Sequence, residues 1–351
     1  MNDNKTAPTG AYVGVYCGMF IIGTAYNYLG MKFSSWLNKF MVIWVAIGTI
    51  IVIITVPAMA PSHQSAKWVF TSFGNETGYK NLGLVFFLGL LQAGWTLIGY
   101  ECAAQIVEGT KRADITAPRG IVICIACAVV QGFVLIIAVL FSIQDVDELI
   151  GSEMPVAVLF LRATSKEITT FFLVILLVAQ FGSLSNCILA TGHLFWAMAR
   201  DRCLPYSNFF YKLDSRSIPV RALMLQLGIA IVVIMPIFGT MIYWEAIMST
   251  AVICVNISYG LPLMCRIIWA GKDMPKGPFN LGKFSLPLNY ISVAWICFFG
   301  VILCIPSVSP VDAVTMNWAS LMIGAVVIFA MCFWFVSGRK FYKGPMQTAM
   351  D

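Results

Sequence analysis

Long apolar segments constrain the fold of this chain more than any other feature of its sequence. The hydrocarbon core of a bilayer is about 30 Å thick, so a helix that crosses it needs roughly 17–25 predominantly apolar residues. Segments of this length recur along the chain, and we expect an all-α integral membrane protein with one transmembrane domain over residues 1–351. Nine transmembrane helices are predicted, near residues 11–30, 40–60, 82–107, 119–141, 168–198, 219–239, 243–269, 286–306 and 315–336.

The composition supports the same fold class. Hydrophobic residues make up 60% of the chain and charged residues 11%, whereas soluble domains have about 45–50% apolar and 25% charged residues. The 11 cysteines lie mostly in apolar segments without metal-ligand spacing, and only two histidines are present. We interpret the cysteines as buried small hydrophobic residues and expect neither disulfides nor a metal cofactor.

Charge in the loops predicts the orientation, because short cytoplasmic loops retain Lys and Arg. With nine helices, 17 of the 22 Lys and Arg residues fall on one side and 5 on the other. The sequence therefore predicts a cytoplasmic C-terminus. On the opposite side, Asn75-Glu76-Thr77 is a glycosylation acceptor, and the segment 155–162 is interpreted either as a short helix across the extracellular mouth or as a solvated loop.

The third predicted helix contains the strongest candidate for a binding site. An ionisable residue deep in a membrane costs roughly 2.5–3.5 kcal/mol and faces a polar cavity or a partner, and Glu101 is such a residue. Its carboxylate would attract the cation of an amino acid or quaternary amine, and aromatic faces nearby would add to this attraction. The alternative is that Glu101 pairs with a basic loop. The predicted substrate-binding residues are Gln92, Gly94, Trp95, Thr96, Gly99, Tyr100 and Glu101.

Other polar groups in the membrane segments have two interpretations. Ser183, Asn186 and Asn256 are candidates for a second wall of the site, although such side chains often only hydrogen-bond a neighbouring helix. Arg200 and Asp201 follow the fifth helix. They are candidates for a cytoplasmic gate or turn, and the alternative is a helix-end cap within a basic loop.

Several motifs together resemble a known family. Thr96–Ala104, Pro118–Ile121, Ala197–Ser207 and Ile257–Pro262 are similar to segments of eukaryotic amino acid and choline permease sequences, within the amino acid–polyamine–organocation superfamily. The resemblance implies a leucine-transporter-like fold of twelve helices in two inverted repeats, with the substrate between broken first and sixth helices. It aligns the nine predicted helices with helices four to twelve, so that Glu101 lies in the broken sixth helix and the first three helices are absent.

The function that the residues and the resemblance imply is secondary transport of an amino acid or related amine, such as GABA or choline, by alternating access. The coupling ion, H+ or Na+, is left open. The alternative is a truncated, non-transporting receptor or regulatory membrane protein. An enzyme is not expected, because neither clustered catalytic side chains nor a phosphate-binding loop is evident. The expected partners are a small-molecule substrate and membrane lipid, with no nucleic acid, in the plasma membrane or an internal membrane.

Overall fold

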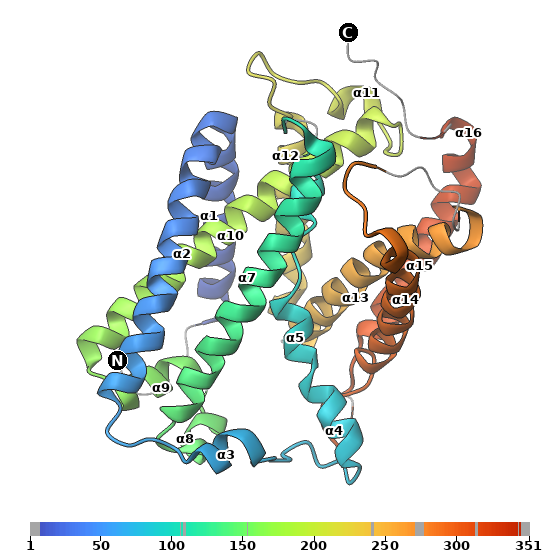
Figure 1. The fold of residues 1–351 in the computed structure, drawn as a ribbon. Helices are drawn as coiled ribbons and strands as arrows, with labels where there is room; N and C mark the ends of the chain where they lie inside the picture. The colour runs from blue at the N-terminus through green and yellow to red at the C-terminus, as the bar shows by residue number, and fades with distance from the viewer. Residues whose placement is uncertain are drawn as a thin grey trace.

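The structure, a computed structural model, is all-helical in the residues that it describes, which are 8–105, 107, 110–152, 154–239, 242–270, 277–312, 315–342 and 344 (Figure 1). Seven of its helices are long and apolar enough to cross a membrane. This confirms the predicted fold class of a multi-pass helical membrane protein. The first predicted helix, α1, is 20 residues long but is not among the seven, and it contains four tyrosines and an asparagine.

The helices overlap the predicted segments, although several begin or end at other residues. The α-helices are α1 (Thr9–Tyr28), α2 (Met31–Met59), α3 (Ala66–Thr71), α4 (Leu82–Gly89), α5 (Leu91–Thr96), α6 (Cys102–Gln105), α7 (Ala113–Phe141), α8 (Val146–Ile150), α9 (Pro155–Ala163), α10 (Lys166–Arg200), α11 (Ser207–Phe210), α12 (Val220–Ile234), α13 (Ile242–Cys265), α14 (Ser285–Ile302), α15 (Ala319–Phe333) and α16 (Arg339–Phe341). Short 3-10 helices, η2 (Met235–Phe238) and η4 (Gly282–Phe284), extend α12 and precede α14, and π-helical turns, η3 (Arg266–Ala270) and η5 (Trp334–Gly338), extend α13 and α15.

The third predicted segment, 82–107, is interrupted, as a broken helix would be. It consists of α4, α5 and α6, and the residues between Thr96 and Cys102 are not helical. Gly99 in this interruption has a φ of +90°, which a residue with a Cβ rarely adopts. Hydropathy measures how apolar a segment is, so it does not detect the loss of helical conformation between Thr96 and Cys102. Ile106, Glu108 and Gly109 of this region lie outside the described residues.

Helix α10 organises one group of helices. It packs against α1, α2 and α12 and also contacts α6 and α9. Two polar contacts join these helices: Asn27 donates to the carbonyl of Ser185 at 3.0 Å, and Trp44 donates to the carbonyl of Ile175 at 3.3 Å. A second group is formed by α13, which packs against α14 and α15. The interrupted segment lies between the two groups in Figure 1.

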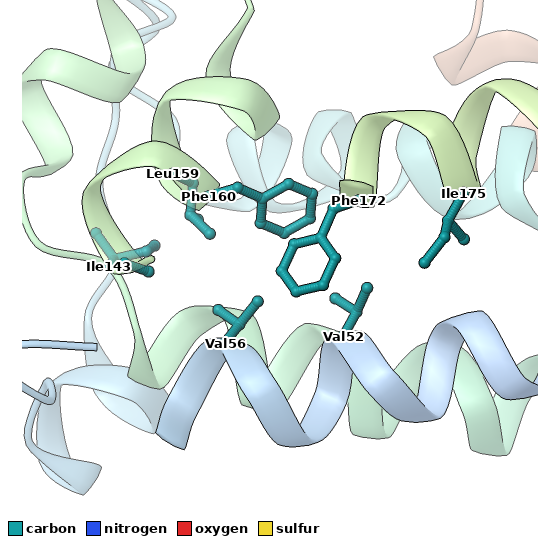
Figure 2. Close-up of a cluster of buried hydrophobic side chains, with 8 residues drawn as sticks. Val52, Val56, Ile143, Leu159, Phe160, Phe172 and Ile175 are labelled. Carbon is teal, nitrogen blue, oxygen red and sulfur yellow. The ribbon is translucent and has the colours of Figure 1, made fainter. Parts of the chain in front are cut away.

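A buried hydrophobic cluster joins α2, α9 and α10 at one end of the molecule (Figure 2). Phe160 of α9 and Phe172 of α10 meet edge to face, with ring centroids 5.1 Å apart, a geometry that adds about 0.5–1.5 kcal/mol to the burial itself. Val52 and Val56 of α2 complete the contact. The segment 155–162 is therefore a packed helix, which decides between the two interpretations of its sequence.

The short helices gather at the two ends of the bundle. Helices α3, α8 and α9 lie at the lower end in Figure 1, whereas α11 and α16 lie at the upper end. The upper end is the one where the basic turn 200–221 connects α10 to α12. The turn 200–221, which belongs to the loops rich in Lys and Arg, thus lies at the end of the bundle opposite to α3, α8 and α9.

Candidate functional site

The candidate site is built around the interruption between α5 and α6. Helix α5 ends at Thr96, and Leu97 leaves the helical conformation with φ −109° and ψ 38°. Gly99 then adopts its positive φ, and α6 begins at Cys102 with a hydrogen bond from its amide to the carbonyl of Gly99 at 3.2 Å. Residues 97–101 are therefore non-helical backbone within a predicted membrane segment, and such backbone is tolerated in a membrane where it lines a cavity or is buried in protein.

Glu101 is held from α13. The hydroxyl of Tyr259 donates to Oε2 of Glu101, and the ring of Tyr259 lies against that of Tyr100, with centroids 4.7 Å apart. Among the described residues, the partner found for this carboxylate is thus a tyrosine hydroxyl and not a basic side chain of a loop. The sequence indicates that Glu101 needs a partner, but it does not identify Tyr259 as that partner.

A first cavity, of about 490 Å³, lies beside the interruption. Tyr100 and Gly94 line it from one side, Asn256 and Tyr259 of α13 from another, and Trp295 of α14 with its neighbours from a third. Asn256 donates to the carbonyl of Val252 within its own helix at 2.8 Å. The aromatic contribution of α14 was not predicted, because Trp295 stands in an apolar segment without a polar neighbour that marks it.

A second cavity, of about 420 Å³, lies between the interruption and α10. Gly99 and Cys102 line it from the interrupted segment, whereas Ser183, Asn186 and Cys187 line it from α10. The fold therefore brings the predicted residues Ser183 and Asn186 to the non-helical backbone. Asn38 of α2 also lines this cavity and had no signal in the sequence beyond its polarity.

Four of the predicted substrate-binding residues do not line these two cavities, and Glu101, which contacts Tyr259, is one of them. Trp95 lines a smaller cavity of about 150 Å³ towards Ser249 and Asn317. Gln92 and Thr96 are exposed, and the hydroxyl of Thr96 donates to the carbonyl of Gln92 at 2.9 Å within α5. Their part in binding stays a prediction.

The turn after α10 is held together by charge and aromatic contacts. Nε of Arg200 lies 3.1 Å from Oδ1 of Asp201, and both side chains are less than a fifth exposed. The Arg200 guanidinium also lies over the ring of Trp196, which stacks on Tyr211. Burial and the charge of Asp201 raise the pKa of the Cys203 thiol above its usual value. This arrangement supports an anchored turn, and a gating role for Arg200 and Asp201 stays a prediction.

The predicted glycosylation acceptor lies in the loop between α3 and α4. Asn75 is exposed, and its side-chain oxygen accepts hydrogen bonds from the amide and hydroxyl of Thr77 at 3.1 and 2.7 Å. The acceptor triplet is therefore folded back on itself as an Asx turn. Whether Asn75 carries a glycan stays a prediction.

Comparison with known proteins decides the family. Residues 2–328 match the family described as "Amino acid permease". The chain belongs to the amino acid permease family. It is 28% identical over 348 residues to a rice (Oryza sativa subsp. japonica) protein named amino-acid permease BAT1 homolog, covering 96% of this chain and 67% of that protein. It is 25% identical to amino-acid permease BAT1 of Arabidopsis thaliana, covering 97% of this chain and 68% of that protein.

A choline transporter of Saccharomyces cerevisiae is also similar. It is 27% identical over 294 residues, which cover 82% of this chain and 52% of that transporter. The chain thus spans about two thirds of the length of the two plant permeases and about half that of the choline transporter. As a permease family member, the protein is assigned to transport and not to enzyme catalysis.

Proposed function

We propose that the protein moves an amino acid or a related amine, such as GABA or choline, across a membrane by alternating access, and that the substrate binds at the interruption 97–101. The observation that carries this proposal is the placement of Glu101. Its carboxylate stands at non-helical backbone within a predicted membrane segment, is oriented by the hydroxyl of Tyr259, and adjoins the neighbouring rings of Tyr100 and Tyr259.

The carboxylate of Glu101, which Tyr259 of the first cavity contacts, and the groups that line the two cavities together fit such a substrate. A carboxylate attracts an ammonium or quaternary amine, and an aromatic face adds about 0.5–2 kcal/mol to the attraction. The hydroxyl of Ser183, the amide of Asn186 and the non-helical backbone at Gly99 offer hydrogen bonds to the carboxylate of a zwitterion in the second cavity. Ligand cavities are typically about 300–1,000 Å³, and both cavities fall in this range.

The proposed orientation places the end with α11 and α16 in the cytoplasm. The turn 200–221 at that end contains Arg200, Arg202, Lys212, Arg216 and Arg221, and short cytoplasmic loops retain such residues. The opposite end, with α3, α8 and α9, then faces the outside or the lumen of an organelle.

Uptake of radiolabelled GABA, choline and amino acids into cells that express the protein tests the proposal. The change Glu101→Gln keeps the shape of the side chain and removes its charge, so we expect uptake to fall sharply while surface abundance stays near normal. Tyr259→Phe removes the hydrogen bond to the carboxylate, which is worth about 1.5–3 kcal/mol for a charged acceptor, and is expected to weaken uptake in the same direction.

The matched control is Glu148→Gln, which also removes a carboxylate. Glu148 pairs with Arg162 at 2.6 Å on the α8–α9 segment, outside the long apolar helices. Uptake should survive this change. Unchanged uptake in Glu101→Gln would remove the role given to Glu101, and substrate binding without any uptake would favour a receptor over a permease.

A further inference from the structure

The turn between α10 and α12 is a folded surface at one end of the molecule. Helix α10, and α12 together with η2, are long and apolar enough to cross a membrane, so residues 201–219 between them are expected at the bilayer surface. The indole of Trp196 on α10 donates to the carbonyl of Tyr211 at 2.9 Å, and Arg221 on α12 donates to the carbonyl of Phe209 at 3.1 Å. Helix α11 also packs against α10 and α12. The turn is therefore held against the ends of both helices.

Part of the positive charge of this turn has no counter-charge in the protein. Residues 200–221 contain five basic and two acidic side chains, which leaves a net charge of +3. Arg200 pairs with Asp201 at 3.1 Å. Arg202 and Lys212 are exposed, and in the described part of the chain neither takes part in an ion pair. These two cations are thus available to an anion outside the protein.

Exposed aromatic side chains lie on the same turn. Tyr206 and Phe209 expose 84% and 54% of their surface. Both line a hollow of about 500 Å³ together with Arg202 and Asn208. Aromatic residues are enriched where a membrane protein meets the lipid headgroups, because their rings suit the boundary between apolar and polar layers. The hollow thus combines a cation and an amide with rings typical of the headgroup layer.

We propose that Arg202, Tyr206, Phe209 and Lys212 form a surface that binds the headgroups of anionic phospholipids, such as phosphatidylserine. The Arg202 guanidinium can hold a phosphate through two parallel hydrogen bonds, and the Lys212 ammonium attracts a second anionic group as a point charge. Tyr206 and Phe209 would lie beside the glycerol region of the lipid. The surface shares no residue with the two cavities beside the interruption, so this inference goes beyond the proposed substrate site.

The place of the turn favours a lipid over an acidic protein or a free phosphate. Lipid is already present where two membrane-crossing helices end, whereas a soluble anion would gain nothing from the exposed rings. In the proposed orientation this end faces the cytoplasm, and anionic lipids are concentrated in the cytoplasmic leaflet. Charge and position therefore indicate the same ligand.

Native mass spectrometry of the full chain in dodecyl maltoside tests the proposal. The protein is titrated with equimolar palmitoyl-oleoyl phosphatidylserine and phosphatidylcholine, and we expect phosphatidylserine to bind preferentially. A basic residue near an anionic membrane surface contributes about fivefold to affinity, so the Arg202→Gln, Lys212→Gln double variant should bind phosphatidylserine on the order of 25-fold more weakly. Equal binding of the two lipids by the unmodified protein overturns the proposal.

The matched control removes the same charge at the other end of the molecule. Lys67 of α3 and Lys80 of the following loop are exposed, and α3 lies opposite α11 in Figure 1. The Lys67→Gln, Lys80→Gln variant should keep its preference for phosphatidylserine. An equal loss in both double variants would assign binding to the overall charge and overturn the proposed surface. Soluble phosphoserine, added at the concentration of the lipid, should not displace phosphatidylserine, and displacement would favour a site for free anions.

Photolabelling locates the lipid without a variant, so the result does not depend on whether the double variant folds. A phosphatidylserine with a diazirine in its headgroup is irradiated with the unmodified protein, which is then digested with trypsin. Cleavage after Arg202 and Lys212 yields the peptide 203–212, which contains Tyr206 and Phe209. We expect this peptide to carry label that excess phosphatidylserine suppresses and excess phosphatidylcholine does not. Label confined to other peptides overturns the proposal. These measurements involve no transport, so they are independent of the proposed function.

Discussion

At the scale of single residues, Gly94 is needed for packing. A Cβ at this position would lie 2.7 Å from two ring atoms of Phe299 on α14, closer than side-chain carbon atoms normally approach. Phe299 is itself buried, with 4% of its surface exposed, so the ring has little room to withdraw. The absence of a side chain at Gly94 therefore lets α5 approach α14. Gly94, which is also a predicted substrate-binding residue, thus has a structural role in packing.

We predict that Gly94→Ala destabilises the protein. Inserting a methyl group into a well-packed contact costs about 1–3 kcal/mol, and thermal unfolding in detergent should show the loss. Gly89→Ala is the matched control, because a Cβ there meets nothing within 4 Å. Combining Gly94→Ala with Phe299→Leu should recover part of the stability. Equal melting temperatures for the two alanine variants would contradict the packing argument.

The residue scale also shows what the sequence can and cannot predict about the site. A carboxylate in an apolar segment identifies Glu101 by its transfer cost alone. The contact with Tyr259 could not be read in the same way, because 158 positions separate the two residues and many polar groups in the later segments were equivalent candidates. Trp295 and Cys187 gave no polar signal at all, and only the packing of α14 and α10 places them at the cavities.

At the scale of elements, the interruption after α5 depends on the backbone at Gly99. Its φ of +90° is strained for residues with a Cβ, yet a Cβ at this position would meet nothing within 4 Å. A side chain at position 99 would therefore be disfavoured by the backbone conformation and not by a clash, whereas at Gly94 it would be disfavoured by a clash with Phe299. The strain arises in the backbone, so any effect of a substitution reports on the interruption itself.

We predict that Gly99→Ala weakens uptake and lowers stability by about 1 kcal/mol or more, since only glycine adopts such backbone angles without cost. Gly99→Asn should be tolerated better, because asparagine visits positive φ more readily than alanine does. Gly300→Ala in α14 serves as the control, as a Cβ there has open space and no positive φ. If Gly99→Ala and Gly300→Ala behave alike in uptake and in thermal unfolding, the interruption does not need glycine.

Hydropathy predicted the elements well in their apolar parts and less well at their ends. Helix α2 begins at Met31 and not near residue 40, and α7 begins at Ala113 and not near 119. Polar and basic residues at the membrane surface continue these helices, and a search for apolar segments does not include them. Hydropathy alone does not divide the third segment into α4, α5 and α6, and this division is indicated by its glycines and by the family resemblance.

At the scale of the whole molecule, the distribution of charge predicts which end faces the cytoplasm. The charge count used only the order of loops along the chain. The structure places α11 and α16 at one end and α3, α8 and α9 at the other (Figure 1). The basic turn 200–221 and the loop between α3 and α4, which contains Asn75, therefore lie at opposite ends. An orientation that places the basic turn in the cytoplasm must also place Asn75 on the other side of the membrane.

We predict that an epitope tag at the C-terminus is reached by antibody only after cells are permeabilised, and that Asn75 is on the opposite side, where glycosylation takes place. Asn4-Lys5-Thr6 is a second acceptor triplet in the sequence, so the mobility shift should be followed in an Asn4→Gln background and should disappear when Asn75→Gln is added. A tag that antibody reaches on intact cells would reverse the orientation. The basic turn after α10 would then face outward, against the retention of positive charge in the cytoplasm.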